Sequence, residues 1–287
     1  MASLKDLKKR VASVKSTEQI TKAMRMVAAA KLRRAQESIV AARPYAIKAN
    51  EVLLSLVNRT NPDMHPLLRT REPHKGVLVV MASDRGLCGA FNQNVFRHAD
   101  AFIKENEKRY DELSLVLVGK RAVDYFKRKN LPIRKAVTIE NPSYDLSSDV
   151  CQDLIDGYIN EEYDELYIVF NEFKSAMTQI LHEDRILPVE RMDSEDDEML
   201  NIEYLYEPDE MTLLDTLLPL SLKMFFYRAL LESAASEHGA RMTAMESASK
   251  NASEMMDKLS VQYNRLRQAS ITTELMEVVG GAEALNG

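Results

Sequence analysis

The sequence predicts an α/β protein in which the N- and C-terminal helices form a long antiparallel coiled coil and a Rossmann-like α/β domain is inserted between them. Both ends of the chain carry apolar residues at heptad spacing, with few of the prolines and glycines that interrupt helices. The middle instead alternates short β-branched runs with helical segments. We therefore expect an N-terminal helix over residues 1–58, an α/β domain over 75–192 and a C-terminal helix over 209–287.

The C-terminal helix is the strongest element of this prediction. Between Pro219 and Gly280 the chain has no proline and one glycine, Gly239, so a continuous helix from about Leu220 to Val279 is the simplest interpretation. Steps of three and four residues pick out a mostly apolar seam of Tyr227, Leu231, Ala234, His238, Arg241, Met245, Ala248, Ala252, Met255, Leu259, Gln262, Leu266, Ala269, Thr273 and Met276. Such a helix would be ~90 Å long and needs a long partner.

The N-terminal residues supply that partner. No proline precedes Pro44 and no glycine precedes Gly76, so a long helix is allowed here as well. A heptad seam begins with Leu4, Leu7, Val11 and Val14, shifts at a stutter to Ile20, Met24 and Val27, and resumes with Ala28, Leu32, Ala35, Ile39 and Ala42. Pro44 is expected to kink the helix or to end its first segment, with further turns around Val52–Val57.

Charge also favours pairing of the two ends. Residues 1–58 carry twelve Lys and Arg against four Asp and Glu, a net of +8, whereas residues 209–287 carry seven against eleven, a net of −4. Each exposed pair contributes only a few tenths of a kcal/mol, so the apolar seam must supply most of the stability. On this pattern alone, a compact helical bundle remains an alternative.

The middle of the chain predicts βαβ units. Prolines at 62, 66 and 73 mark a linker, after which strands are expected at 76–82, 113–118, 133–139, 165–171 and 178–189. Helical spacing separates them at 91–110, 120–129 and 146–163. Strands alternating with helices imply a mainly parallel sheet. The acidic run over 193–198 is expected to be a solvated loop.

Composition narrows the class of protein. The chain has a net charge of −6 and two cysteines, Cys88 and Cys151, which form no CxxC pair. With no targeting segment before the first helix, we expect a cytoplasmic chain without disulfides. No apolar run reaches the ~18 residues needed to span a bilayer, so membrane association is expected only through partners.

Motifs for catalysis or cofactor binding are missing from the sequence. The five histidines lack metal-ligand spacing, and there is no phosphate loop, GxSxG elbow or GxGxxG. We therefore expect neither cofactor nor metal. The nearest candidate is the loop over 83–92, between a strand and a helix, where α/β folds often bind anions. The simpler interpretation is a tight turn in which Asp84 and Arg85 pair locally and Cys88 packs as a small hydrophobe.

Six motifs, in order, resemble the γ subunit of the bacterial F-type ATP synthase. They are Ile20–Ala29 (ITKAMRMVAA), Arg43–Ala46 (RPYA), Ser83–Gly89 (SDRGLCG), Glu203–Pro208 (EYLYEP), Ser236–Met242 (SEHGARM) and Tyr263–Glu274 (YNRLRQASITTE). The resemblance covers essentially the whole chain. It implies a central-stalk rotor inside a hexamer of α and β subunits, which couples ion-driven rotation of the c-ring to ATP synthesis or hydrolysis.

The resemblance also implies where chemistry and contacts lie. Catalysis would occur on the β subunits, so this chain is expected not to be an enzyme. Its partners would be the α and β subunits, the ε subunit and the c-ring, with no nucleic acid. The complex would place the chain as a peripheral protein on the cytoplasmic side of the bacterial inner membrane.

Site residues follow from the matching motifs. The resemblance implies that β subunits contact Lys22, Met24 and Arg25, the loop at Arg85 and Cys88, and a C-terminal set of Arg267, Gln268 and Thr272. It implies that the c-ring contacts Tyr204, Tyr206 and Glu207.

Two other classes of function make distinct predictions. A nucleic-acid-binding coiled coil using the basic N-terminal helix would bind DNA or RNA with strong salt dependence. An α/β enzyme using the loop over 83–92 would bind a phosphate compound as an isolated chain.

Overall fold

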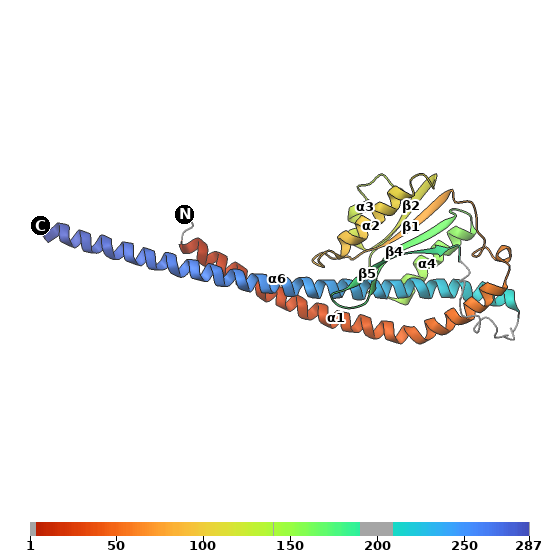
Figure 1. Ribbon diagram of the computed structural model, residues 1–287, viewed down its shortest axis with the longest axis horizontal. Coiled ribbons are helices and arrows are strands. Elements are labelled where there is room, and N and C mark those ends of the chain that lie inside the picture. Colours follow the sequence, from red (N-terminus) through yellow and green to blue (C-terminus); the bar gives the residue numbers. More distant parts are fainter. Residues whose placement is uncertain (1–3, 140, 190–208, 287) are drawn as a thin grey trace. The chain divides into compact units, whose positions relative to one another are not determined.

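The computed structural model describes residues 4–139, 141–189 and 209–286 (Figure 1). The chain divides into two compact units: Met1–Ala28 with Met242–Gly287, and Ala29–Arg241. Two long helices, α1 (Leu4–Arg59) and α6 (Glu210–Asn286), contribute residues to both units. The long terminal helices and the α/β domain inserted between them confirm the predicted fold class.

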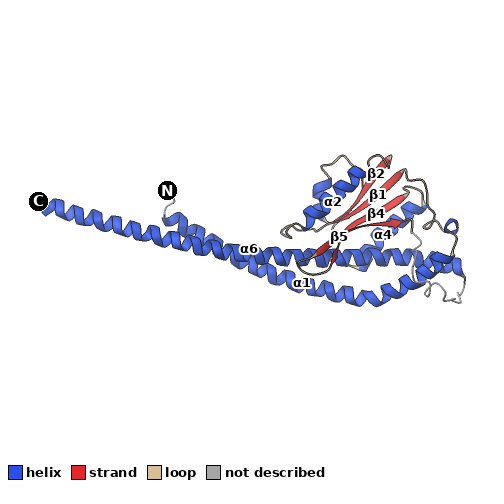
Figure 2. Ribbon diagram, in the orientation of Figure 1, coloured by secondary structure: helices blue, strands red, loops and turns tan. Residues whose placement is uncertain are grey.

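In the described part of the larger unit, five strands form one sheet in the order β3-β2-β1-β4-β5 (Figure 2). β1 lies parallel to both β2 and β4, β2 lies parallel to β3, and β5 is antiparallel to β4. The expected mainly parallel sheet is confirmed. The strands are β1 (Lys75–Met81), β2 (Glu112–Val118), β3 (Ile133–Val137), β4 (Glu165–Phe173) and β5 (Gln179–Leu187).

Helices cover both faces of this sheet, as Figure 1 shows. α2 (Phe91–Glu105) and α3 (Lys120–Phe126) pack on one face. α4 (Tyr144–Ile159) and the first part of α6 pack on the other. Because neither face meets solvent, β1 is an uninterrupted apolar run that is buried from Gly76 onward.

The first part of α6 is a core helix of the α/β unit. Leu214, Leu218, Leu222 and Phe226 recur every four residues and are buried against the sheet. The helix begins at Glu210, not near Leu220, because the Asp209 carboxylate accepts the Thr212 backbone N–H at 2.9 Å and caps the first turn. Pro219 therefore lies inside the helix. Packing of the leucines on either side outweighs the hydrogen bond that proline cannot make.

Of the two outcomes expected at Pro44, a kink in the helix or the end of its first segment, the second is wrong, because α1 continues through Pro44 to Arg59. Pro44 is exposed, and so is Val40, whose carbonyl loses its helical donor at this proline. Water can satisfy a carbonyl on an exposed face, so the proline is tolerated.

The proline-rich linker is part of the core. A short 3₁₀ turn, η1 (Pro62–Met64), leads to Leu67 and Leu68, which are buried against the sheet-facing helices. His65 is also buried: its Nδ1 accepts the Leu67 N–H at 3.1 Å, and its Nε2 lies 3.2 Å from Asp215 of α6. Burial lowers the pKa of His65, and the Asp215 carboxylate opposes this shift.

In the smaller unit, the α1 seam runs without a stutter. Buried and half-buried positions recur at steps of three and four residues: Leu4, Leu7, Val11, Val14, Glu18, Thr21, Arg25 and Ala28. Met24, expected in the seam, and Ala29 are half-buried beside them. Ile20 and Val27, expected in the seam, are instead 56% and 58% exposed. The sequence prediction followed apolar residues, whereas the helix kept its register and placed polar residues in the seam.

The seam of α6 in this unit also departs from the prediction, and the predicted positions from Leu266 onward are exposed. Met245 and Ala252 are buried, and Met256, Leu259 and Tyr263 are half-buried. Met255, the expected seam residue, is 54% exposed. Met256 and Tyr263 take the alternate seam positions where Met255 and Gln262 were expected, while Met245, Ala252 and Leu259 keep their seven-residue spacing.

Candidate functional site

Near the end of the α1 seam, the structure places the predicted contact residues on or beside the surface. Lys22 is exposed, and Met24 and Arg25 are half-buried. Arg25 lies 3.5 Å from Glu246 of α6, and both side chains remain substantially exposed. Such a pair is weak and exchangeable, so Arg25 stays available to another acidic group.

Exposed apolar residues adjoin this set. Ile20, Met26 and Val27 are all more than half exposed, although they belong to an apolar stretch of the sequence. They do not pack in the coiled-coil interface, because Thr21, Arg25 and Ala28 occupy the seam. Apolar residues that a helix pair does not bury are typical of a surface that meets another protein.

The C-terminal contact residues lie on an exposed stretch of α6. Arg267, Gln268 and Thr272 are all exposed, and the Thr272 hydroxyl donates to the Gln268 carbonyl at 2.9 Å. Several large apolar residues around and beyond them are exposed as well: Leu266, Ile271, Leu275, Met276, Val278 and Val279. The end of α6 therefore displays a mixed polar and apolar surface.

The predicted loop at 83–89 follows β1 and is held by its own side chains. The Asn92 side chain accepts the Ser83 N–H at 3.0 Å and donates to the Ser83 hydroxyl at 2.7 Å. The expected local pair between Asp84 and Arg85 is not formed. Asp84 instead accepts the backbone N–H of Lys120 at the start of α3, at 2.8 Å, and Arg85 is exposed.

The structure places Cys88 beneath this loop. Its thiol is 2% exposed and lies 3.3 Å from the Asn92 side-chain amide, which donates to the sulfur. The groups that the loop shows to solvent are Arg85 and Leu87, the latter 65% exposed. Leu87 and Gly89 have φ angles of 65° and 59°, in the left-handed region. A contact through this loop would therefore use its tip, with Cys88 supporting it from below.

Helix α6 forms hydrogen bonds to the loop over 83–89 through Arg241. The Arg241 guanidinium donates from Nη2 to the carbonyls of Arg85 at 3.1 Å and Gly86 at 3.2 Å. Its Nη1 donates to the Glu237 carboxylate one turn earlier on the same helix. One side chain thus joins two loop carbonyls to a helix carboxylate.

The groups around Arg241 are electrostatically perturbed. Burial raises the pKa of Glu237, and Arg241 opposes this shift. Burial lowers the pKa of His238 to about 4, and the charges of Arg241 and Lys31 add to that effect. At neutral pH the cluster therefore contains a neutral imidazole beside a charged guanidinium.

The same stretch of α6 docks onto the β4–β5 hairpin. The Ser236 hydroxyl donates to the Asn171 carbonyl at 3.2 Å, and Glu232 accepts the Phe173 N–H at 3.0 Å. A Cβ at position 239 would lie 3.1 Å from the Cα of Ala176, which explains the one glycine in this part of the helix.

The motif over 236–242 was part of the family resemblance, but the sequence alone assigned it no role. The signals were present: a lone glycine in an unbroken helix, and a charged residue, Arg241, in an apolar seam.

The geometry argues against a phosphate site at this loop. A phosphate cradle presents backbone N–H donors, whereas Arg85 and Gly86 present carbonyl oxygens, which already accept from Arg241. The enzyme alternative therefore finds no support in the arrangement of the loop.

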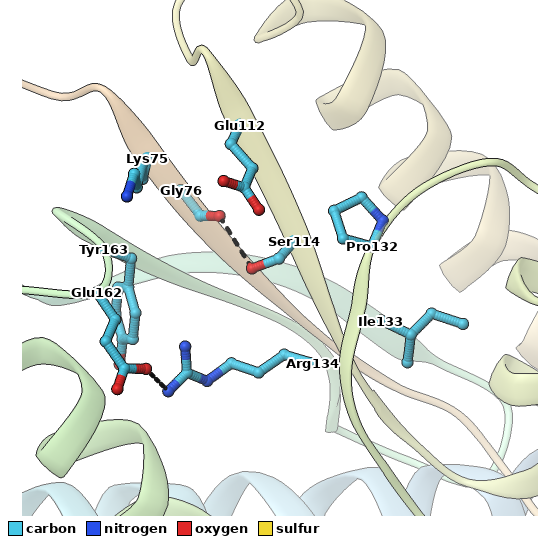
Figure 3. Close-up of a pocket in the computed structure, with 9 residues that line it drawn as sticks. All are labelled: Lys75, Gly76, Glu112, Ser114, Pro132, Ile133, Arg134, Glu162 and Tyr163. Carbon is cyan, nitrogen blue, oxygen red and sulfur yellow. Dashed lines mark hydrogen bonds and ion pairs between the residues drawn. The ribbon is translucent and has the colours of Figure 1, made fainter.

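A shallow pocket of about 180 Å³ lies at the opposite edge of the sheet, where β1, β2 and β3 begin (Figure 3). Two of its charged side chains are paired with each other, since Arg134 donates to Glu162; Arg134 also lies over the Tyr163 ring at 5.3 Å from the centroid. Within the described residues, no group of three or more His, Cys, Asp or Glu is arranged to hold a metal ion.

The predicted c-ring contacts, Tyr204, Tyr206 and Glu207, lie outside the described residues, as does the acidic run over 193–198. None of the helices in the described ranges is both long and apolar enough to cross a membrane.

Comparison with known sequences identifies close relatives. A family model described as ATP synthase matches residues 3–285. The ATP synthase gamma chains of Trichlorobacter lovleyi and Geotalea uraniireducens are 49% and 50% identical over 288 residues, covering 100% of both proteins in each pair. The gamma chain of Anaeromyxobacter dehalogenans is 47% identical over 290 residues, covering 99% of this chain and 100% of its own.

Solved structures of ATP synthases also match this chain. A chain of the Tetrahymena thermophila mitochondrial ATP synthase, from a structure of the central stalk and c-ring, matches with a TM-score of 0.62 and 26% identity, covering 80% of this chain and 99% of that chain. A chain of the Euglena gracilis mitochondrial ATP synthase matches with a TM-score of 0.71 and 21% identity, covering 98% and 94%. The second similarity is one of fold alone.

Proposed function

The chain belongs to the γ-chain family of ATP synthases, and from this premise we propose that it is the central-stalk rotor subunit of an F-type ATP synthase. It couples ion-driven rotation of the c-ring to conformational changes in the catalytic β subunits during ATP synthesis or hydrolysis. The observation that carries the proposal is identity of 49–50% with bacterial ATP synthase gamma chains over the full length of both proteins.

The contact surfaces fit this role. The surface of α1 at Lys22, Met24 and Arg25, the tip of the loop above Cys88 at Arg85, and the exposed end of α6 at Arg267, Gln268 and Thr272 face the β subunits. Weak charge pairs and exposed apolar residues suit contacts that must form and break in each catalytic cycle. The c-ring contacts are Tyr204, Tyr206 and Glu207, and the ε subunit is a further partner.

Catalysis belongs to the β subunits, and this chain is not itself an enzyme. The occupied carbonyls of the loop over 83–89 support this division, because the position where an α/β fold would hold phosphate is used to bind helix α6. The chain is a peripheral protein on the cytoplasmic side of the bacterial inner membrane, and it reaches the membrane only through its partners.

The test is reconstitution with purified α and β subunits of Geotalea uraniireducens, whose gamma chain is 50% identical. We expect one copy of the chain in each α–β hexamer and MgATP hydrolysis that depends on its presence. The Geotalea uraniireducens gamma chain serves as the matched control. If that control assembles and activates hydrolysis while this chain does neither, the proposal is wrong.

A further inference from the structure

The loop over 83–89 is joined to α6 chiefly through one side chain. We propose that Arg241 is a positioning residue: it latches this loop closed and thereby sets how Arg85 and Leu87 are presented to a β subunit. The latch concerns this chain alone, whereas its effect on presentation rests on the proposed rotor function.

The chemistry of arginine suits the latch. Carbonyls in a loop outside regular secondary structure need donors. The Ser83 hydroxyl donates to the Arg85 carbonyl at 2.7 Å within the loop, and the Nη2 atom of Arg241 adds a donor from α6 to the carbonyls of both Arg85 and Gly86. The other terminal nitrogen is held by Glu237, so the guanidinium is fixed before it meets the loop. A planar fork can bridge these groups at once, whereas the single ammonium of lysine cannot hold the same geometry.

The loop has a conformation that requires support. Leu87 has a side chain yet adopts a φ of 65°, a left-handed conformation that costs roughly 1 kcal/mol or more. Its side chain is 65% exposed, so packing within this chain does not account for that conformation. Contacts made by its neighbours must hold it: the Ser83 hydroxyl donates to the Arg85 carbonyl from within the loop, and Arg241 provides two hydrogen bonds from α6.

Cys88 is a built-in reporter of loop opening. Its thiol is 2% exposed beneath the latched loop, so release of the loop would uncover it. The other cysteine, Cys151, is 4% exposed within α4, against the sheet, and burial raises the pKa of its thiol to about 12. Cys151 therefore stays unreactive unless the α/β unit itself opens.

The first experiment measures modification of both cysteines by a thiol-specific disulfide reagent in the full-length chain, with mass spectrometry assigning each site. In Arg241→Gln, which keeps a good helix former, we expect Cys88 to react about tenfold faster, as loss of charged hydrogen bonds should raise the open population. Arg241→Lys should fall between Gln and wild type. The matched control is Arg228→Ala on the same helix, whose side chain is 59% exposed and lies 4.0 Å from Glu232.

Each result either supports or overturns the proposal that Arg241 holds the loop closed. Faster Cys88 modification at unchanged Cys151 reactivity supports it. A Cys88 rate in Arg241→Gln equal to those of wild type and Arg228→Ala overturns it. If Cys151 also becomes reactive in Arg241→Gln, the variant is unfolding, and the Lys variant decides by the same criterion.

The second experiment separates the latch from the rotor function. The variants are assembled with α and β subunits, and MgATP hydrolysis is measured per assembled complex. We expect Arg241→Gln to assemble at wild-type yield with severalfold lower turnover, and Arg241→Lys to recover part of it. Unchanged turnover with an exposed Cys88 overturns the effect on presentation and leaves the latch standing. Failure of the wild-type chain to assemble contradicts the rotor function instead.

Discussion

His238 illustrates how single residues in α6 are tuned by the cluster around Arg241. Its ring is largely buried, with the Glu237 carboxylate at 3.8 Å and the Arg241 guanidinium at 3.5 Å. Burial comes first among the causes that lower its pKa to about 4, followed by the positive charges of Arg241 and Lys31. The folded state therefore favours the neutral imidazole.

This requirement predicts a pH dependence. Because the folded pKa lies below the ordinary value of 6.5, the unfolded chain binds more protons between those two values, and stability falls as pH falls through this window. We expect His238→Gln to lose about 2 kcal/mol less stability than wild type between pH 7 and pH 4.5. Urea unfolding at both pH values measures the difference.

His65, whose pKa is also lowered, is present in both proteins and cancels from the comparison. An equal loss of stability in wild type and His238→Gln would contradict the assignment of a depressed pKa to His238.

Both helices of the smaller unit depart from the seam that their apolar residues alone predict. α1 keeps strict heptad spacing and accepts Glu18, Thr21 and Arg25 into its seam. α6 keeps Ala252 and Leu259 in its seam and places Met256 between them, where the apolar pattern had predicted Met255. A heptad seam is thus a property of backbone geometry, which side-chain polarity only partly reveals.

The two adjacent methionines form a matched pair for testing which of them lies in the seam. We expect Met256→Ala to lower the free energy of unfolding by about 1 kcal/mol, because it removes part of the packing between α1 and α6. Met255→Ala should cost less than about 0.5 kcal/mol, since its side chain is mostly in solvent. Thermal unfolding followed by circular dichroism measures both, and a larger effect at Met255 would place Met255 in the seam instead of Met256.

Across the whole molecule, α1 and α6 each serve two purposes. In the α/β unit, the first part of α6 is a core helix under the sheet. In the smaller unit, its later part pairs with α1 and then displays an exposed surface. Residues of α6 therefore belong both to the core of the α/β unit and to the exposed surface of the smaller unit.

This arrangement predicts a separation of stability from function. Arg267→Ala with Gln268→Ala removes exposed side chains, so helicity and unfolding temperature of the isolated chain should be unchanged. In the reconstituted complex, MgATP turnover should fall about fivefold, as hydrogen bonds to a β subunit are lost. Lys258→Ala with Gln262→Ala, also exposed on α6, is the control pair. Equal turnover in both double variants would remove Arg267 and Gln268 from the contact surface.

The sequence by itself determined the elements and their class. Missing helix breakers at both ends, and β-branched runs separated by helical spacing in the middle, were sufficient to predict the long helices and the mainly parallel sheet. Local patterns suffice there because the helix and strand preferences of neighbouring residues, together with apolar periodicity, decide each element.

Only the tertiary structure decided the rest. Arg241 and the loop carbonyls it binds are 155 and 156 residues apart in the chain, so no local pattern could join them. The polar seam of α1, the passage of α6 through Pro219 and the burial of Cys88 also depended on what lies opposite each residue. Packing between distant segments sets these features, because the free energy of burial and of hydrogen bonding belongs to a pair of surfaces rather than to one stretch of sequence.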